Sequence, residues 1–115
     1  MNELAQQHCS VITAATPRLN VRDFNPYLSI LPDWEIYEEG DEPRLEKVFK
    51  FKDFIQAIAF TNKVAQVANE EDHHPAILTE WGKVTITWWT HKIRGLHQND
   101  FIMAAKTDQL YEGSA

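Results

Sequence analysis

The chain alternates between helical and strand-like patterns of hydrophobic residues, and the longest helical pattern lies near its centre. This pattern begins after Asp53 and runs to about Glu70. Asp53 and Gln56 have the spacing of a capping box, which predicts that a helix begins at this point. The apolar positions recur at the 3.6-residue spacing of one helix face, wide enough to cover a sheet. They are Phe54, Ala57, Ile58, Thr61, Val64, Ala65 and Ala68.

Four shorter segments have the two-residue alternation of half-buried strands. They span residues 34–38, 45–51, 76–81 and 84–91. The turn-forming sequence at 39–43 separates the first two, and Gly82-Lys83 separates the last two. Each pair is therefore predicted to form an antiparallel hairpin.

Two further helices are predicted at residues 21–31 and 100–111, where apolar residues recur at helical spacing. The element order is then α-β-β-α-β-β-α. This order predicts an α+β fold with a four-stranded antiparallel sheet and about three helices packed on one face. Residues 1–20 are weakly periodic and contain Thr16-Pro17, so we expect a loosely ordered N-terminal arm there. Residues 21–115 are expected to form a single domain.

The size of the chain predicts a single domain, and its net charge argues against nucleic-acid binding. Its 115 residues, 43% of them hydrophobic, are enough for one domain with a buried core. A net charge of −6 argues against nucleic-acid binding, which needs clustered basic residues. Three lysines come closest to a basic cluster: Lys47, Lys50 and Lys52. We expect them to lie on a solvent-exposed strand edge.

The cysteine content and the lengths of the apolar runs indicate the cellular compartment that we expect for this protein. Cys9 is the only cysteine, so no intramolecular disulfide can form and cysteine-based zinc sites are excluded. A single thiol fits a reducing cytoplasm. The N-terminal residues lack the basic and apolar regions of a signal peptide, and no apolar run approaches the ~20 residues of a membrane helix. We therefore expect a cytoplasmic protein without membrane contact.

Three histidines and a carboxylate form a candidate site for acid–base chemistry. His73 and His74 precede Pro75, which cannot continue a helix and therefore marks the junction between the central helix and the third strand. His91 stands at the predicted end of the fourth strand, where a rigid element would fix its ring. Asp100 lies in the first turn of the final helix, from which a carboxylate can orient an imidazole. Because histidine titrates near neutrality, these rings can both donate and accept protons.

Each of these residues also has a simple structural interpretation. A histidine beside a proline is often a turn residue, and Asp100 in a first helical turn is often only a partner for the helix dipole. A zinc site built from the three histidines is a further alternative, although their spacing is not that of common zinc motifs. His97 is expected to start the final helix and His8 to lie in the arm. The nearby tryptophans fit a core or an interface better than a stacking platform: Trp81, Trp88 and Trp89.

Taken together, these residues resemble the pterin-4a-carbinolamine dehydratase family. The matching set is His73-His74-Pro75, Trp81, His91, Gly95-Leu96 and Asp100. The resemblance implies dehydration of 4a-hydroxytetrahydrobiopterin to quinonoid dihydropterin, which recycles the pterin cofactor of aromatic amino acid hydroxylases such as phenylalanine hydroxylase. It implies no metal and no separate cofactor, because the pterin is the substrate. It also implies homodimers joined through their sheets, or homotetramers.

The resemblance further assigns roles to single residues. His73 and His91 are the expected acid–base pair, and His74 is the expected catalytic-site residue that binds and orients the pterin. The expected substrate-binding and supporting residues are Asp100, Glu70, Trp81 and Pro75. Many family members carry an acidic residue four positions before the first histidine, where this chain has Asn69. We expect the neighbouring Glu70 to substitute for it.

Two other functions are compatible with the sequence. One is a non-catalytic, dehydratase-like scaffold that binds a protein partner as a dimerisation or assembly factor. The other is a metal-binding storage or sensor domain. The presence of all three histidines and Asp100 favours catalysis, because a scaffold alone would not need them.

Overall fold

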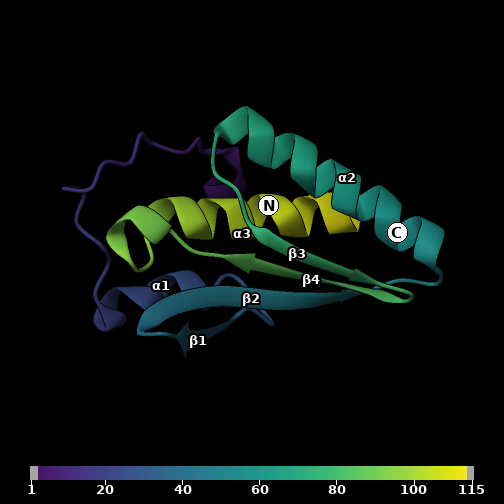
Figure 1. Cartoon of the computed structure of the whole chain (residues 1–115), viewed down its shortest axis with the longest axis horizontal. Coiled ribbons are helices and arrows are strands. Elements are labelled where there is room, and N and C mark those ends of the chain that lie inside the picture. The colour runs from purple at the N-terminus through teal and green to yellow at the C-terminus, as the bar shows by residue number, and fades with distance from the viewer. Residues whose placement is uncertain (1–2, 114–115) are drawn as a thin grey trace.

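A four-stranded antiparallel sheet, with the strand order β1-β2-β4-β3, forms the framework of the computed structural model, which describes residues 3–113 (Figure 1). The strands are β1 (Glu35–Glu39), β2 (Glu42–Lys50), β3 (Ala76–Glu80) and β4 (Lys83–Trp88), and the helices are α1 (Phe24–Leu28), α2 (Phe54–Glu71) and α3 (Gln98–Glu112). Short 3-10 turns occupy Glu3–Gln6, Val21–Asp23 and His91–Ile93. The predicted α+β fold is confirmed.

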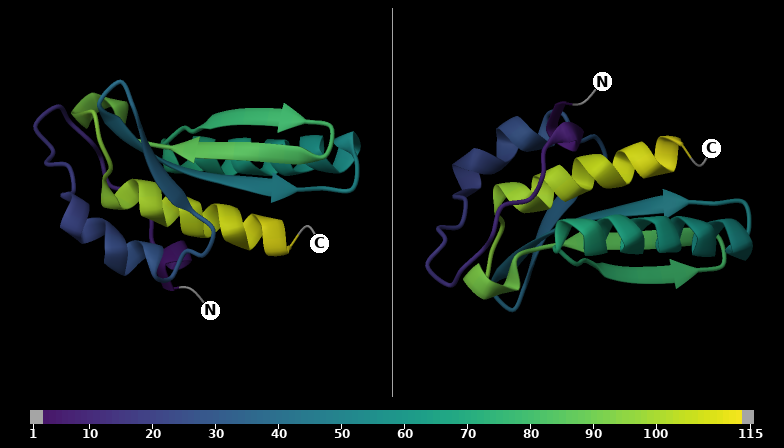
Figure 2. Two further views of the ribbon diagram at one scale, coloured as in Figure 1. Left: turned by 90° about the horizontal axis from the view of Figure 1, so that it is seen from below. Right: turned by 90° about the horizontal axis from the view of Figure 1, so that it is seen from above.

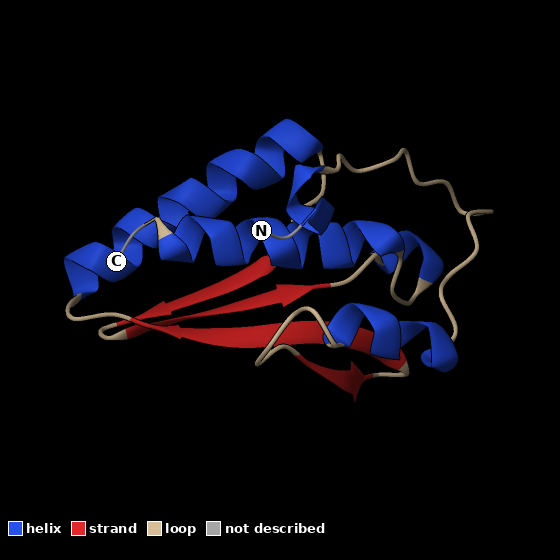
Figure 3. Cartoon of the chain, turned by 180° about the vertical axis from the view of Figure 1, so that it is seen from behind, coloured by secondary structure: helices blue, strands red, loops and turns tan. Residues whose placement is uncertain are grey.

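The helices α2 and α3 lie on the same side of the sheet (Figure 3). The face of the sheet beneath them is apolar, because alternate residues of β4 point inward as predicted. Val84, Ile86 and Trp88 are all fully buried. In the β2–β4 register, Leu45 lies opposite Trp88 and Phe49 opposite Val84. This interdigitated layer forms the centre of the core.

The buried face of α2 is rotated relative to the predicted stripe. Asp53 caps the helix as predicted, since its Oδ1 accepts from the Gln56 N–H at 2.8 Å. However, Phe54 and Ile58 are exposed, whereas Phe60, which the prediction left out, is buried. The Phe60 ring packs on Phe49 and Phe51. Burying this ring removes more apolar surface from water than burying Ile58 would, so aromatic packing decides the rotation of the helix.

The first hairpin turns more tightly than the sequence predicts. The predicted turn spans 39–43, but only Gly40 and Asp41 lie between β1 and β2. Both have left-handed backbone conformations, with φ of 56° and 66°, which matches a two-residue hairpin loop. Strand β2 therefore begins at Glu42 rather than Leu45. Glu42 is buried at this end of the strand.

Lys47 is not part of a solvated edge, contrary to the prediction. It occupies an inward position of β2, opposite Ile86, and its Nζ lies 2.8 Å from Asp108 Oδ1 on α3. The Trp34 indole N–H donates to the other oxygen of Asp108 at 3.0 Å. Burial raises the pKa of Asp108 above its usual value, against the opposing effect of Lys47 and Trp34. The ion pair therefore compensates for two charged groups under the sheet.

The beginning of the N-terminal arm packs against α3. Leu4 and Ala5 are buried, and Lys106 of α3 donates to the Ala5 carbonyl at 3.0 Å. Figure 2 shows this segment crossing α3 before it runs along the end of the fold. Most of residues 11–18 are exposed. Residues 1–2 of the arm and 114–115 of the domain lie outside the described residues. Between residues 3 and 113, no helix combines the length and apolar character needed to cross a membrane.

Candidate active site

The end of α2 turns His73 into the interior. Asp72 ends the helix in a left-handed conformation with φ of 53°, and its N–H bonds to the carbonyls of Ala68 and Asn69. The His73 N–H then bonds to Ala68 O at 3.1 Å, a common way of closing a helix C-terminus. His73 is consequently only 8% exposed. Its ring stacks on the buried Trp88, with 5.8 Å between ring centroids and an 8° interplanar angle.

Asp100, at the start of α3, holds the His73 ring in place. This carboxylate is fully buried and accepts from His73 Nε2 at 2.7 Å. It also accepts from the Thr90 hydroxyl at 2.8 Å and the His97 backbone N–H at 2.9 Å. Because a carboxylate only accepts hydrogen bonds, it places a proton on Nε2 of His73. Nδ1 is then the ring nitrogen left for a substrate.

His97 starts α3, as predicted, and helps to place Asp100. Its Nδ1 accepts from the Asn99 N–H at 3.0 Å, and Asp100 returns a bond to its backbone, so the two residues form a capping box. Burial lowers the pKa of His97 below its usual value, although the charge of Asp100 opposes this shift. The lowered pKa favours the neutral ring, which can act as the acceptor in this cap. Asp100 is therefore both a helix cap and a partner for His73.

His91 lies in a turn and not at the end of a strand. The strand predicted to run to His91 ends at Trp88, and His91 begins a 3-10 turn. A pair of backbone hydrogen bonds between Thr90 and Gly95 closes this loop. A Cβ at Gly95 would lie 2.9 Å from the Arg18 side chain, so glycine permits the close approach. The side chain of His91 is 79% exposed, with Nδ1 3.3 Å from Glu42 Oε1.

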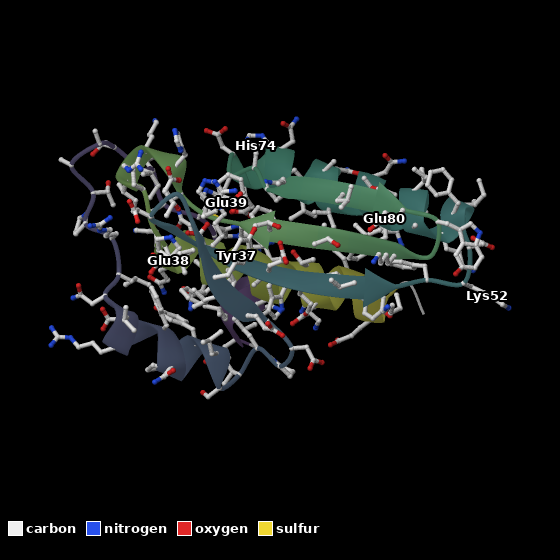
Figure 4. The ribbon with its side chains drawn as sticks, turned by 60° about the horizontal axis from the view of Figure 1, so that its bottom comes forward. Tyr37, Glu38, Glu39, Lys52, His74 and Glu80 are labelled. Atoms are coloured by element: carbon white, nitrogen blue, oxygen red, sulfur yellow. The ribbon has the colours of Figure 1, made fainter. Side chains whose placement is uncertain are left out.

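His74, unlike His73, is exposed. Its Nε2 lies 3.3 Å from Asn69 Oδ1, so Asn69 contacts one of the two neighbouring histidines. Glu70 and Pro75 line a separate shallow cavity that His74 also borders. Trp81 is 72% exposed in the turn between β3 and β4. Figure 4 labels His74 before β3 and Glu80 at the far end of that strand. Trp81 directly follows Glu80 in the chain, so β3 separates it from His74.

One cavity of about 530 Å³ joins the three histidines. Trp89, Thr90 and Lys92 contribute to its wall, as do residues 9–12 of the N-terminal segment. Its volume suits a small bicyclic molecule. The sequence supplied no signal for the contribution of residues 9–12, because an irregular polar segment has no periodicity that predicts where it packs.

Two side chains fasten this N-terminal wall. The buried Asn99 accepts from the Ser10 N–H and donates to the Ser10 carbonyl, each at 2.9 Å. Glu71 accepts from the Cys9 N–H at 2.8 Å and pairs with His8 at 2.7 Å. Burial, followed by the charges of Glu71 and Asp100, raises the pKa of Cys9 to about 12. The thiol therefore stays protonated near neutrality and is unsuited to act as a nucleophile.

Glu71 is expected to make the attachment of the N-terminal wall dependent on pH. Burial alone would raise its pKa, but the Cys9 N–H, the His8 ring and Lys106 together lower it. A lowered pKa contributes stability that is present above the unfolded value of 4.5 and is lost as the pH falls through the folded value. We expect Glu71→Gln to unfold at lower urea concentration than wild type at pH 7.

The difference between wild type and Glu71→Gln should shrink as the pH is lowered below 4.5, where the wild-type carboxyl also becomes neutral. Urea unfolding at a series of pH values measures it. Glu70→Gln is the matched control, since Glu70 is exposed and accepts a long hydrogen bond of 3.5 Å from Gln66 in its own helix. A difference that does not change with pH would contradict the role assigned to the Glu71 carboxylate.

The three histidines line one cavity, and His73 is paired with a buried carboxylate. Within residues 3–113, no group of three or more His, Cys, Asp or Glu side chains is placed to hold a metal ion. The described geometry is instead one buried imidazole–carboxylate pair beside a second, accessible imidazole. Such a pair can transfer protons at a planar substrate.

Comparisons with known proteins define the class to which this fold and site belong. The family model for pterin 4 alpha carbinolamine dehydratase matches residues 17–110. The chain therefore belongs to the pterin 4 alpha carbinolamine dehydratase family, and the resemblance recognised in the sequence is confirmed.

Two curated relatives carry the name "Putative pterin-4-alpha-carbinolamine dehydratase". The protein of Marinobacter nauticus is 55% identical over 111 residues, which are 96% of this chain and 100% of the relative. The protein of Saccharophagus degradans is 53% identical over 113 residues, covering 98% and 100%. In both cases the similarity covers the whole of the relative and nearly all of this chain.

Two solved structures are similar to this chain. A transcriptional coactivator/pterin dehydratase from Brucella melitensis has a TM-score of 0.74 and 33% identity, covering 82% of this chain and 98% of that one. A pterin dehydratase-like protein identified as a RuBisCO assembly factor in the alpha-carboxysome has a TM-score of 0.59 and 26% identity, covering 69% and 89%. Proteins named for a dehydratase and for an assembly role thus share this fold.

Proposed function

We propose that the protein is a dehydratase that converts 4a-hydroxytetrahydrobiopterin, a pterin-4a-carbinolamine, to quinonoid dihydropterin and water. The observation that carries this proposal is that His73, paired with the buried Asp100, lines the same cavity as His91. Membership in the family supports the substrate class. The names of two curated relatives, which are 55% and 53% identical to this chain, also support the substrate class.

The reaction requires two proton transfers around one carbon–oxygen bond. The C4a–O bond breaks as a proton reaches the leaving hydroxyl, and the adjacent ring N–H loses its proton as the C=N double bond forms. His73 is the proposed base, because Asp100 holds the proton on Nε2 and stabilises the imidazolium that forms when Nδ1 accepts. His91 is the proposed acid, since its exposed ring can recover a proton from solvent.

The remaining site residues have binding roles in this proposal. His74, at the edge of the same cavity, orients the pterin, and Asn69 holds the His74 ring. The reaction removes one water molecule from the substrate and involves no oxidation or reduction, so the proposal includes no separate cofactor. The product would be available for reduction and reuse by an aromatic amino acid hydroxylase such as phenylalanine hydroxylase.

The same proposal includes a homodimer or homotetramer. Large apolar side chains are exposed on the face of the sheet that the helices leave open. Tyr37, Val48 and Leu78 belong to this group. An apolar sheet face favours association with a second apolar surface.

A second candidate function is a protein-binding role without turnover. It is supported by the structural neighbour named as an assembly factor. Ile55 and Trp81 are also strongly exposed. Their two segments lie close together, because the Phe51 N–H donates to the Gly82 carbonyl. Exposed tryptophan is a frequent anchor of protein interfaces. Stable complex formation by a protein with no dehydratase activity would favour this alternative.

The test is the rate of quinonoid dihydropterin formation from 4a-hydroxytetrahydropterin. The spontaneous rate without protein is the baseline, and the double variant His73→Ala/His91→Ala is the inactive control. We expect the wild type to accelerate the reaction in proportion to protein concentration and the double variant to return it to baseline. No acceleration by a folded wild-type protein would overturn the proposed function.

A further inference from the structure

We infer that Glu42 is a positioning residue that fixes the tautomer of His91, and this inference rests on the proposed function. Glu42 is the first residue of β2, far from the histidines in sequence. Its side chain is only 7% exposed, and its Oε1 lies 3.3 Å from His91 Nδ1. Nothing in the spacing of the candidate residues indicated this contact.

The carboxyl group of Glu42 is enclosed by two turns of the chain. The tight Gly40-Asp41 turn places Glu42 at the edge of the fold, next to the loop that carries His91. Arg94, at the end of that loop, pairs with Glu42 Oε2 at 3.4 Å and donates to the Gly40 carbonyl at 3.3 Å. A buried carboxylate needs such partners to offset its desolvation. Arg94 thus holds one oxygen, and the other is left for His91.

This arrangement determines which nitrogen of His91 can react. Because a carboxylate only accepts hydrogen bonds, the proton of the neutral ring lies on Nδ1, opposite Glu42. Nε2 is then the nitrogen available to the substrate. When Nε2 of the imidazolium gives its proton to the leaving hydroxyl, the product is the tautomer that Glu42 accepts from. His73 has the reverse arrangement, since Asp100 contacts its Nε2 and leaves Nδ1.

The two histidines therefore form two carboxylate-oriented pairs that offer different nitrogens to one cavity. One pair is buried and rigid, and the other is open to solvent on the side of His91. The charged groups next to His91 are Glu42 and Arg94, while Lys92 points to the Ile12 carbonyl at 3.4 Å. Glu42 is thus the acceptor that defines the orientation of the accessible ring.

The test replaces Glu42 with Gln, which keeps the shape but changes the hydrogen-bonding pattern. Arg94 can only donate, so it holds the amide oxygen, and the amide NH₂ then faces His91 Nδ1. The neutral His91 ring should change from the Nδ1–H to the Nε2–H tautomer. Nitrogen-15 chemical shifts of the His91 ring, measured above its titration range, report this change directly and do not depend on activity.

Dehydration should slow by about tenfold or more in Glu42→Gln, mainly through kcat, as expected for loss of a group that orients a reacting side chain. Glu42→Asp should keep the Nδ1–H tautomer and most of the activity. The matched control is Glu46→Gln on the same strand, whose carboxylate accepts from Thr87 at 2.8 Å and does not line the cavity. It should change neither readout.

The outcomes separate this inference from the proposed function. An unchanged His91 tautomer in a folded Glu42→Gln variant would overturn the positioning role, whatever the activity. A changed tautomer with unchanged kcat would also overturn it for catalysis. If the tautomer changes but the wild type does not accelerate dehydration, the contact is established and the proposed function fails.

Discussion

Replacing His73 is expected to lower the rate of dehydration by about 10²–10⁴-fold, because a positioned general base is removed. Asp100 orients this ring from a fully buried position, and Trp88 packs on its face. Both His73→Ala and His73→Gln should show the loss. The measurement is the catalysed rate of quinonoid dihydropterin formation, after subtraction of the spontaneous rate.

The glutamine variant decides between a chemical and a structural role for His73. Its amide can fill much of the imidazole volume and still donate to Asp100, but it cannot accept a proton near neutrality. If His73→Gln retained near-wild-type turnover while His73→Ala lost it, His73 would serve only to support the fold. Urea unfolding of both variants verifies that any loss of activity occurs in folded protein.

Replacing Asp100 is expected to affect stability and activity together. Asp100→Ala would leave three buried donors without their acceptor, on His73, Thr90 and the His97 backbone. Removing one partner of a buried charged network typically costs about 3–5 kcal/mol in the free energy of unfolding. Urea unfolding measures this loss. Dehydratase activity should fall as well, because the His73 ring loses the group that orients it.

Two further variants, Asp100→Asn and Asp108→Asn, separate the effect of Asp100 on activity from its effect on stability. Asp100→Asn keeps the volume and one acceptor oxygen, so it should lose less stability but still disturb the His73 tautomer and lower the catalysed rate. Asp108 lies on the same helix and also has buried polar partners, Lys47 and Trp34, but it is outside the histidine cavity. Asp108→Asn should lower stability and leave the catalysed rate unchanged. Equal activity in Asp100→Asn and wild type would contradict the role of Asp100.

Several elements were predictable because local rules determine them. The alternation from Val84 to Trp88 specified a strand with one buried face, and all its inward residues are buried. Asp53 specified the start of α2, since a capping side chain acts within one helical turn. The motif around His73 and His91 identified the family without reference to the fold.

Two of the errors share a cause, which is competition between segments distant in sequence. Phe60 is buried in preference to Ile58 because the rings of Phe49 and Phe51 lie beneath it. Lys47 is enclosed because α3 supplies Asp108 as its partner. Neither partner is within reach of a local periodicity, so the pattern of one segment could not predict the outcome.

The sequence by itself determined the strand and helix types, the candidate residues for acid–base chemistry and the family. Only the tertiary structure decided how those residues pair. The end of α2 and the start of α3 dock on one sheet, which brings His73 to Asp100, and the tight first hairpin brings Glu42 to His91. The N-terminal segment completes the cavity through Asn99. These contacts join segments far apart in the chain, and they depend on packing the whole core, which no short stretch of sequence encodes.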